Sequence, residues 1–219
     1  MHNFIMTAIA VLSLTFSTMV SAAPNLEVSA FSRHVWRGAS AGDVVSIQPS
    51  LTVPFDSTGT SLNIWGQLPI NGGTSEYDFT VSQEVGEYAT VILTSYYYPS
   101  DTSPLFDVDS HDIEVGVSSS FGDASVYVGR VVSSVSVEGD TYAEVGYPLF
   151  GFGLVVGAGD GAYSESGDFG VVNVGLSYVP VPPARGDRES ARRWLKGYGA
   201  SFIYNPDSET PYFVVSKTW

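Results

Sequence analysis

The sequence predicts an all-β fold: a closed, antiparallel, up-and-down transmembrane β-barrel of about twelve strands. Three observations lead to this prediction. Past residue 25 the chain is a series of short alternating segments, each bounded by Gly, Asp, Asn, Ser or Pro. The connections between these segments are alternately short and long. Only 15% of the residues are charged, against about 25% in soluble domains.

Each predicted strand is about ten residues long, the length that a tilted strand needs to cross a bilayer. In chain order, we expect strands at about 26–37, 45–54, 60–68, 76–85, 88–98, 111–121, 124–133, 140–148, 151–159, 168–179, 198–205 and 211–219.

The predicted connections are of two kinds. Outer-membrane barrels have short periplasmic turns and longer outer loops, so an alternation of the two favours a barrel over a soluble sandwich. We expect tight turns at 55–59, 86–87, 122–123 and 148–151, and longer loops at 69–75, 99–110, 134–139 and 160–167.

The predicted strands also have two distinct faces. In 76–85, Tyr77, Phe79 and Val81 share a face opposite Asp78. A barrel in a membrane would turn the apolar face outward to lipid, whereas a soluble sandwich would bury it. The period of two therefore leaves both architectures open.

The N-terminal segment 1–22 is predicted to be a cleaved signal peptide. Ile5 to Val20 is apolar, and Val20-Ser21-Ala22 has the small-x-small pattern that signal peptidase reads. Cleavage after Ala22 would export residues 23–219 as a single outer-membrane barrel domain. The exported chain has no cysteine, so it has neither disulfides nor thiol-ligated metal.

The net charge of −14 gives the chain no general attraction for nucleic acid, so nucleic-acid partners are excluded. The segment 181–197 differs from the rest because it is basic, and we interpret it as an insertion in one connection. By strand count it lies on the periplasmic side, where it could rest on anionic lipid headgroups or remain a solvated loop.

The closing segment 211–219 is predicted to be the strand that seals the barrel by pairing with 26–37. Phe213, Val215 and Trp219 fall on one face at period two. Lys217 shares that outward face, where it has to reach the headgroups to avoid hydrocarbon.

Several short motifs resemble the TorF-like porin family of Gram-negative bacteria. They are Ser32 to Gly38, Gln48 to Leu51, Ile64 to Gly66, Tyr77-Asp78, Tyr96 to Pro99 and Val215 to Trp219. The resemblance implies an outer-membrane barrel with no established enzyme activity and no cofactor. Trp219 at the end, where phenylalanine is more usual, and the segment 181–197 depart from the family pattern. By similarity to outer-membrane proteins generally, the C-terminal strand would be recognised by the barrel assembly machinery.

The polar faces of the strands assign a set of charged residues to the lumen. These side chains could line a narrow, cation-favouring path or form ion pairs that hold the wall rigid and plug the bore. The predicted lumen residues are Arg33, Arg37, Glu76, Asp78, Glu84, Asp112, Glu114 and Glu144.

Aromatic residues near the predicted strand ends suggest anchors at the two membrane interfaces, in contact with outer-membrane lipid. The alternative is that such rings fill an interior. The predicted anchors are Trp36, Trp65, Tyr98, Tyr212 and Trp219.

The function that fits these features is a porin-like channel for passive diffusion of small solutes, not an enzyme. One alternative is a non-conducting barrel with a structural or surface-interaction role. Another is an outer-membrane lipid hydrolase using His34 or His111, although no glycine-rich nucleophile turn is present. We expect no metal site, because the acidic loop around Asp107 and Asp109 lacks regular ligand spacing. The solute and the oligomeric state are not predicted.

Overall fold

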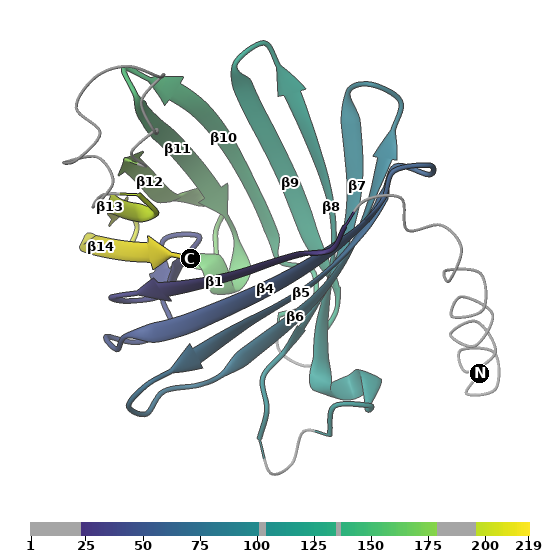
Figure 1. The fold of residues 1–219 in the computed structure, drawn as a ribbon. Helices are drawn as coiled ribbons and strands as arrows, with labels where there is room; N and C mark the ends of the chain where they lie inside the picture. Colours follow the sequence, from purple (N-terminus) through teal and green to yellow (C-terminus); the bar gives the residue numbers. More distant parts are fainter. Residues whose placement is uncertain (1–22, 101–103, 135–136, 179–195) are drawn as a thin grey trace.

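The computed structural model describes residues 23–100, 104–134, 137–178 and 196–219. Its main sheet is a closed antiparallel barrel of twelve strands (Figure 1). Strands that follow one another in the chain are neighbours in the barrel wall. The first strand, β1 (Asn25–Phe31), pairs with both β14 (Thr210–Thr218) and β4 (Ser46–Phe55), which closes the cylinder. The predicted fold class is confirmed.

The predicted strand boundaries after residue 45 lie within two residues of those in the structure. The predicted signal peptide 1–22 and most of the predicted insertion 181–197 lie outside the described residues. The remaining wall strands are β5 (Thr60–Pro69), β6 (Glu76–Val85), β7 (Ala89–Tyr97), β8 (His111–Phe121), β9 (Ala124–Ser133), β10 (Thr141–Leu149), β11 (Phe152–Gly159), β12 (Gly170–Tyr178) and β13 (Tyr198–Asn205).

The two ends of the barrel differ in their connections. At the short-turn end lie the turns that join β4 to β5, β6 to β7, β8 to β9 and β10 to β11, together with the C-terminus. At the long-loop end lie the longer connections, two of which contain the short 3-10 helices η2 (Val108–Ser110) and η3 (Gly161–Tyr163). The turn between β13 and β14 is a short one at this end.

The outer surface of the wall is apolar. Along β6, Phe79 and Val81 point outward while Asp78 and Thr80 point into the lumen, as the period of two predicts. The outward residues that remain exposed include Ile64, Leu93, Val117, Val145, Phe202 and Phe213. A soluble sandwich would bury such residues, so the closed wall with an apolar exterior excludes that architecture. No helix in the described part of the chain is long and apolar enough to cross a membrane.

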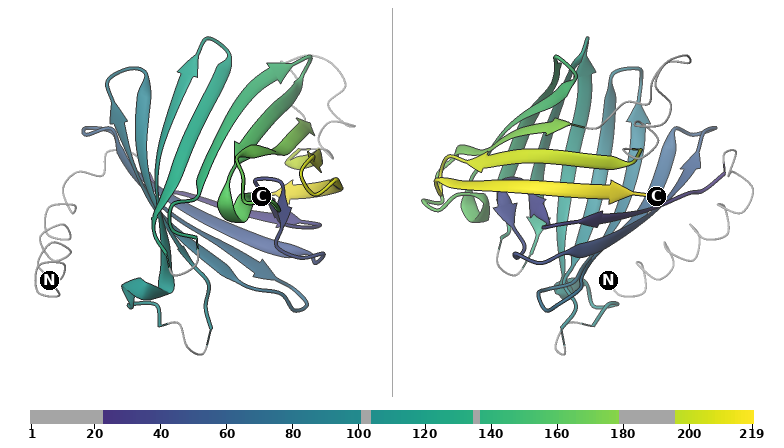
Figure 2. Two further views of the ribbon diagram at one scale, coloured as in Figure 1. Left: turned by 180° about the vertical axis from the view of Figure 1, so that it is seen from behind. Right: turned by 60° about the vertical axis from the view of Figure 1, so that its left-hand side comes forward.

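The first predicted strand, 26–37, is wrong beyond Phe31. The chain leaves the wall there and folds into the barrel as a hairpin of β2 (Val35–Trp36) and β3 (Ala39–Ser40) (Figure 2). We call residues 32–45 the lumen hairpin. Arg37 and Gly38, at its tip, have φ values of 50° and 82°. Both central residues of a type I′ turn have positive φ, and this reversal prevents a continuous strand.

The closing seam joins β14 to β1 by three residue pairs, from Ser29 opposite Thr218 to Phe31 opposite Ser216. The backbone N–H of Trp219 also donates to the Val28 carbonyl at 3.0 Å. The predicted pairing of the two ends of the chain is therefore confirmed.

Lys217 lies on the outward face of β14, as predicted. Its ammonium group lies 4.6 Å from the centre of the Tyr198 ring and donates to the Lys196 carbonyl at 2.5 Å. The side chain thus reaches polar partners at the short-turn end while its stem covers the wall.

Candidate functional site

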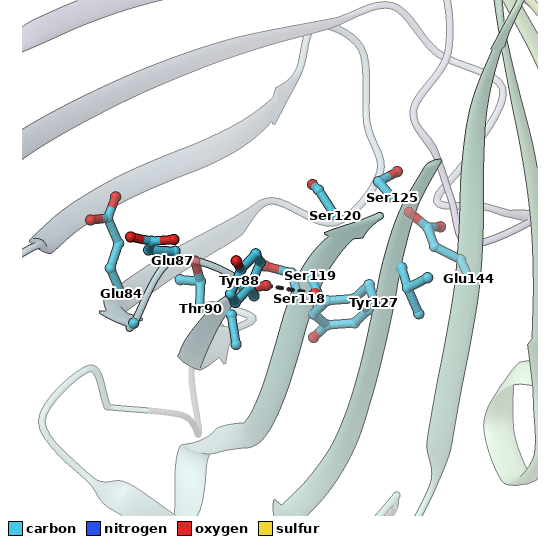
Figure 3. Close-up of a pocket in the computed structure, with 13 residues that line it drawn as sticks. Glu84, Glu87, Tyr88, Thr90, Ser118, Ser119, Ser120, Ser125, Tyr127 and Glu144 are labelled. Carbon is cyan, nitrogen blue, oxygen red and sulfur yellow. Dashed lines mark hydrogen bonds between the residues drawn. The ribbon is translucent and has the colours of Figure 1, made fainter. Parts of the chain in front are cut away.

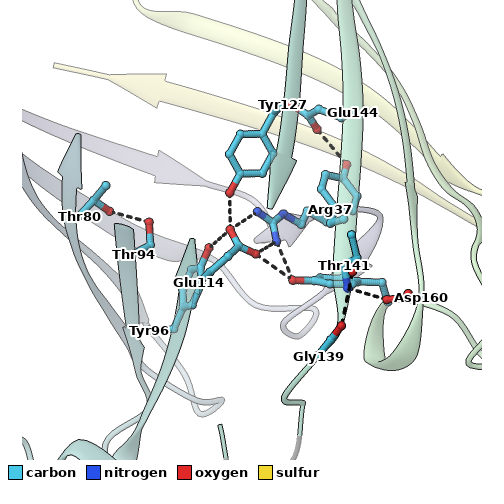
Figure 4. Close-up of polar contacts among 12 residues, drawn as sticks. Arg37, Thr80, Thr94, Tyr96, Glu114, Tyr127, Gly139, Thr141, Glu144 and Asp160 are labelled. Carbon is cyan, nitrogen blue, oxygen red and sulfur yellow. Dashed lines mark hydrogen bonds and ion pairs between the residues drawn. The ribbon is translucent and has the colours of Figure 1, made fainter. Parts of the chain in front are cut away.

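The tip of the lumen hairpin brings Arg37 against Glu114, on the inner face of β8 (Figure 4). One guanidinium nitrogen, Nη1, lies 2.5 Å from Glu114 Oε2, and the other, Nη2, lies 2.7 Å from Oε1. This is the bidentate geometry in which a planar guanidinium fits a carboxylate best. The hairpin therefore reaches across the lumen to the wall.

Tyrosine hydroxyls complete the polar contacts of this pair. Glu114 accepts hydrogen bonds from Tyr96 at 3.2 Å, from Tyr163 at 3.3 Å and from Tyr127. Arg37 Nη1 also donates to the Tyr163 hydroxyl at 2.6 Å. Each carboxylate oxygen thus has several donors, which is the condition for a buried ion pair to be tolerated.

Aromatic rings surround the Arg37 guanidinium. Its central carbon lies 4.2 Å from the centre of the Trp36 ring and 4.5 Å from that of Tyr142, with Tyr127 and Tyr163 both at 5.3 Å. Rings at these distances attract a cation through their π faces. We call the surrounding residues the arginine cage, and they are Trp36, Tyr96, Glu114, Tyr127, Tyr142 and Tyr163.

The arginine cage removes both charges almost completely from solvent. The Arg37 side chain is 8% exposed and that of Glu114 is 1% exposed. Replacing a buried pair as a whole changes stability little, whereas removing one partner costs about 3–5 kcal/mol because the other charge is left unpaired. The contact therefore fixes the position of the hairpin more than it stabilises the barrel.

A second contact holds the hairpin tip from the opposite wall. Asn205 Nδ2 donates to the Gly38 carbonyl at 3.2 Å. The register between β11 and β12 shifts at Val172, so that its backbone carbonyl lies against Gly38. A Cβ atom at Gly38 would collide with that carbonyl, so the tip requires glycine for space as well as for its positive φ.

The base of the lumen hairpin is held by polar and ring contacts. Arg33 forms an ion pair with Asp43 at 3.0 Å. Gln48 Nε2 donates a hydrogen bond to His34 Nδ1 at 3.1 Å, and the His34 ring lies 5.4 Å from the Trp65 ring, measured between ring centres. The Arg33–Asp43 pair lies within the hairpin, whereas Gln48 and Trp65 come from the inner faces of β4 and β5, so the base of the hairpin packs against the wall at His34.

A cavity of about 760 Å³ opens at the short-turn end (Figure 3). Tyr127 and Glu144 border it on the side of the arginine cage, where Tyr142 donates to Glu144 at 2.8 Å. A smaller cavity of about 270 Å³ shares Glu84 with it. The larger cavity is lined by Glu84, Gly86, Glu87, Tyr88, Ala89, Thr90, Ser118, Ser119, Ser120, Ser125, Val126, Tyr127 and Glu144.

The structure places every residue predicted for the lumen inside the barrel. Arg33 and Arg37 belong to the lumen hairpin, and the carboxylates of Glu76, Asp78, Glu84, Asp112, Glu114 and Glu144 come from inner faces of the wall strands. The structure brings only Arg37 and Glu114 of this set into an ion pair with each other. The predicted role of these residues in selectivity stays a prediction.

The prediction of interface anchors is wrong in position for four of the five residues. Trp36 lies in the lumen hairpin, and Trp65 faces inward against His34. Tyr98 donates to Glu76 in the lumen at 2.8 Å, and the Tyr212 ring faces Arg33.

Trp219 alone of these five lies on the outer side, where it is 69% exposed. The physical reason is that nearness to a strand end says nothing about which face a ring occupies. The position of a residue relative to the alternation decides that, and Tyr212 falls in phase with the inward Val214.

The cage tyrosines were not predicted as site residues. Tyr127 and Tyr142 are inward by the alternation of β9 and β10, a signal that the sequence carries. Tyr163 lies in η3, in a loop that folds back over the lumen. Its inward position could not be predicted, because a loop has no regular alternation of faces.

The two histidines of the predicted hydrolase lie on different sides of the wall. His34 is inside, in the lumen hairpin, whereas His111 lies outside and its Nδ1 is 2.7 Å from Ser95 Oγ. The backbone around Ser95 is paired on both sides within the sheet, so it supplies no free N–H for an oxyanion. Among the described residues, no group of three or more His, Asp or Glu side chains is placed to hold a metal ion.

No protein-family model and no curated protein matches this chain. Among solved structures, the chain is similar to the outer membrane protein opdK from Pseudomonas aeruginosa, with 17% sequence identity and a TM-score of 0.33. The match covers 88% of this chain and 61% of the opdK chain, so the chain spans less than two thirds of that protein's length. The resemblance to the TorF-like porins remains a prediction.

Proposed function

We propose that the protein is an outer-membrane channel through which small solutes diffuse passively. The observation that carries this proposal is the distribution of side chains on the two faces of the wall. Apolar side chains cover the outside, and a polar lumen contains a cavity of about 760 Å³. Among β-sheet structures, only a closed barrel can cross a bilayer with its backbone groups satisfied and its polar side chains inside.

The lumen hairpin would be the constriction of this channel. It crosses the bore between the cavity and the long-loop end, and its tip contacts the wall at Glu114 and Asn205. Among the predicted lumen residues the carboxylates outnumber the arginines, so the path favours cations over anions.

The same proposal covers export and assembly. Segment 1–22 would direct the chain through the inner membrane, and the outward aromatic end at Trp219 would be read by the barrel assembly machinery. The short-turn end would then face the periplasm, as in bacterial outer-membrane barrels. The motifs that resemble those of the TorF-like porins are consistent with this assignment.

The number of different contacts that hold Arg37 favours a second candidate function. Arg37 is held by hydrogen bonds, an ion pair and rings at once, as expected of a permanent plug. A plugged barrel would not conduct and would serve a structural or surface-interaction role.

Planar-bilayer recording of the refolded protein separates the two functions. A channel gives stable single-channel steps whose reversal potential in a salt gradient shows cation preference. A barrel that is fully folded by circular dichroism, inserts in the bilayer and remains silent would refute the channel and support the plug.

A further inference from the structure

The arginine cage already holds a guanidinium group, and that group belongs to the protein itself. Glu114 offers two oxygens to its fork, the Tyr163 hydroxyl accepts a further hydrogen bond, and the Trp36 and Tyr142 rings lie against its faces. Except for Trp36, every member of the cage comes from the wall or from the loop after β11. The wall therefore forms a receptor for a planar cation without help from Arg37.

We infer that the arginine cage is a binding site for solutes that carry a guanidinium group, and that Arg37 is a tethered occupant of it. An incoming solute would take the place of Arg37 on Glu114 and release the tip of the lumen hairpin. The role of such solutes as cargo rests on the proposed channel function, but their binding does not.

The chemistry of the cage selects this class of cation. Two parallel hydrogen bonds to one carboxylate match the planar fork of a guanidinium and no feature of a spherical metal ion. A guanidinium is also weakly hydrated and stacks on aromatic faces, whereas a compact ammonium keeps its water more strongly.

The cage borders the larger cavity. Tyr127 lines that cavity and also donates to Glu114, and Glu144 lines it and accepts from Tyr142. A cation in the cavity would thus meet the acid side chains Glu84 and Glu144 before it reached the cage.

The backbone at Arg37 supports a role for its side chain. With φ at 50°, this position favours glycine, and an L side chain is accommodated there at a cost. The compensation is the set of contacts made by the guanidinium. Because Arg37 is tethered, its high effective concentration keeps free cations out of the cage in the intact protein.

The test uses the variant Arg37→Gly, which empties the cage and suits the backbone at the tip. Guanidinium chloride at millimolar concentration is titrated into the refolded barrel in detergent, with binding followed by calorimetry and by tryptophan fluorescence, since Trp36 lies in the cage. We expect saturable one-site binding at least about tenfold tighter than to the unaltered protein. Sodium chloride at the same concentration should not bind.

Two further variants make the result specific. Arg37→Gly combined with Glu114→Gln should lose the binding, whereas Arg33→Ala, which removes the other lumen arginine, should behave like the unaltered protein. A folded Arg37→Gly barrel without saturable binding, or equal binding after Glu114→Gln, would overturn the inference. If Arg37→Gly does not fold, Arg37→Asn, which tolerates the positive φ of this position better than alanine does, is titrated instead under the same criteria. Because binding is measured in detergent, a barrel that binds guanidinium but never conducts refutes only the channel function.

Discussion

Glu114 is the residue on which the position of the lumen hairpin depends. Its carboxylate accepts from both guanidinium nitrogens of Arg37 and from three tyrosine hydroxyls, and it is 1% exposed. A neutral amide in its place would keep the shape but leave the Arg37 charge unpaired inside the barrel. At the residue scale, the hairpin is held in place by a charge.

Glu114→Gln should therefore loosen the hairpin tip without opening the barrel. Loss of one partner of a buried pair costs about 3–5 kcal/mol, which is enough to expose Arg37 for a measurable fraction of the time. We expect trypsin to cleave after Arg37 at least about tenfold faster in the refolded variant, as seen by mass spectrometry. The control is Glu84→Gln, which removes a carboxylate from the cavities away from the hairpin. Equal cleavage of both variants would show that Glu114 does not hold the tip.

Gly38 allows the steric part of the hairpin contact to be tested separately. An alanine there would meet the Val172 carbonyl, so Gly38→Ala should push the tip off the wall and increase cleavage after Arg37. Gly72 has a similar φ of 70°, but no atom lies within 4 Å of the point that an added Cβ would occupy. Gly72→Ala therefore carries the same backbone cost without the collision. If Gly72→Ala increases cleavage as much, the collision with Val172 is not the cause.

The inward faces of the wall strands could be predicted from the sequence, but the contacts of the lumen hairpin could not. The inward position of the strand carboxylates followed from alternation, because a strand in a closed wall has only two faces. The pairing of Arg37 with Glu114 did not, because it depends on a turn that reverses the chain. Trp36 and Tyr212 were assigned to the membrane interface since composition alone cannot distinguish a lipid-facing ring from one that packs in the lumen.

The lumen hairpin is the element that sequence periodicity missed. Val35 and Trp36 have the side chains of a strand, so they extended the predicted first strand to residue 37. The signal that ends the strand is local: Arg37-Gly38 suits a two-residue turn with positive φ at both positions. The wall strands have no such interruption, and their boundaries were predicted well because turn residues mark each end.

Removing the lumen hairpin should convert the barrel into a wider pore. Phe31 and Ser46 face each other in the β1–β4 register, so Asn-Gly can join them as a tight turn in place of 32–45. We expect a folded barrel whose single-channel conductance is several times that of the unaltered protein. The control replaces the turn 206–209, at the same end, by Asn-Gly between the paired Asn205 and Thr210. A conductance unchanged by removal of the hairpin would mean that the constriction lies elsewhere.

At the scale of the whole molecule, the separation of charge from apolar surface defines how the protein can act. The chain carries a net charge of −14, yet the outer faces of its strands are almost entirely apolar. Acidic side chains are therefore confined to the lumen and to the two ends of the barrel. With this distribution, the charged side chains that line the lumen determine whether cations or anions are preferred.

Replacing Glu84 and Glu144 together by glutamine should reduce cation preference. Both carboxylates line the larger cavity, which lies at the short-turn end of the proposed path. We expect the reversal potential in a potassium chloride gradient to move toward zero. The matched control, Asp107→Asn with Asp109→Asn, removes the same charge from an exposed loop and should leave selectivity unchanged. An equal shift in both double variants would indicate that the field of the whole protein, and not the cavity, sets the preference.

Closure of the barrel depends on a short seam between the two ends of the chain. β1 and β14 share three residue pairs, whereas β13 and β14 share eight. Deleting residues 217–219 would remove two of the three seam pairs and the hydrogen bond from Trp219 to Val28. An open wall exposes unpaired backbone groups on two edges, which hydrocarbon does not tolerate.

The truncated chain should therefore lose the resistance to detergent that a closed barrel has. On a cold SDS gel the unaltered protein should migrate differently before and after boiling, and the truncated chain should run at the boiled position in both cases. Trp219→Phe keeps the backbone hydrogen bond and an outward ring, so it should migrate like the unaltered protein. Each of the eleven other strand pairings is longer than the three pairs of the β1–β14 seam. A truncated chain that still changes its migration on boiling would show that these pairings give the barrel its resistance to detergent without the seam.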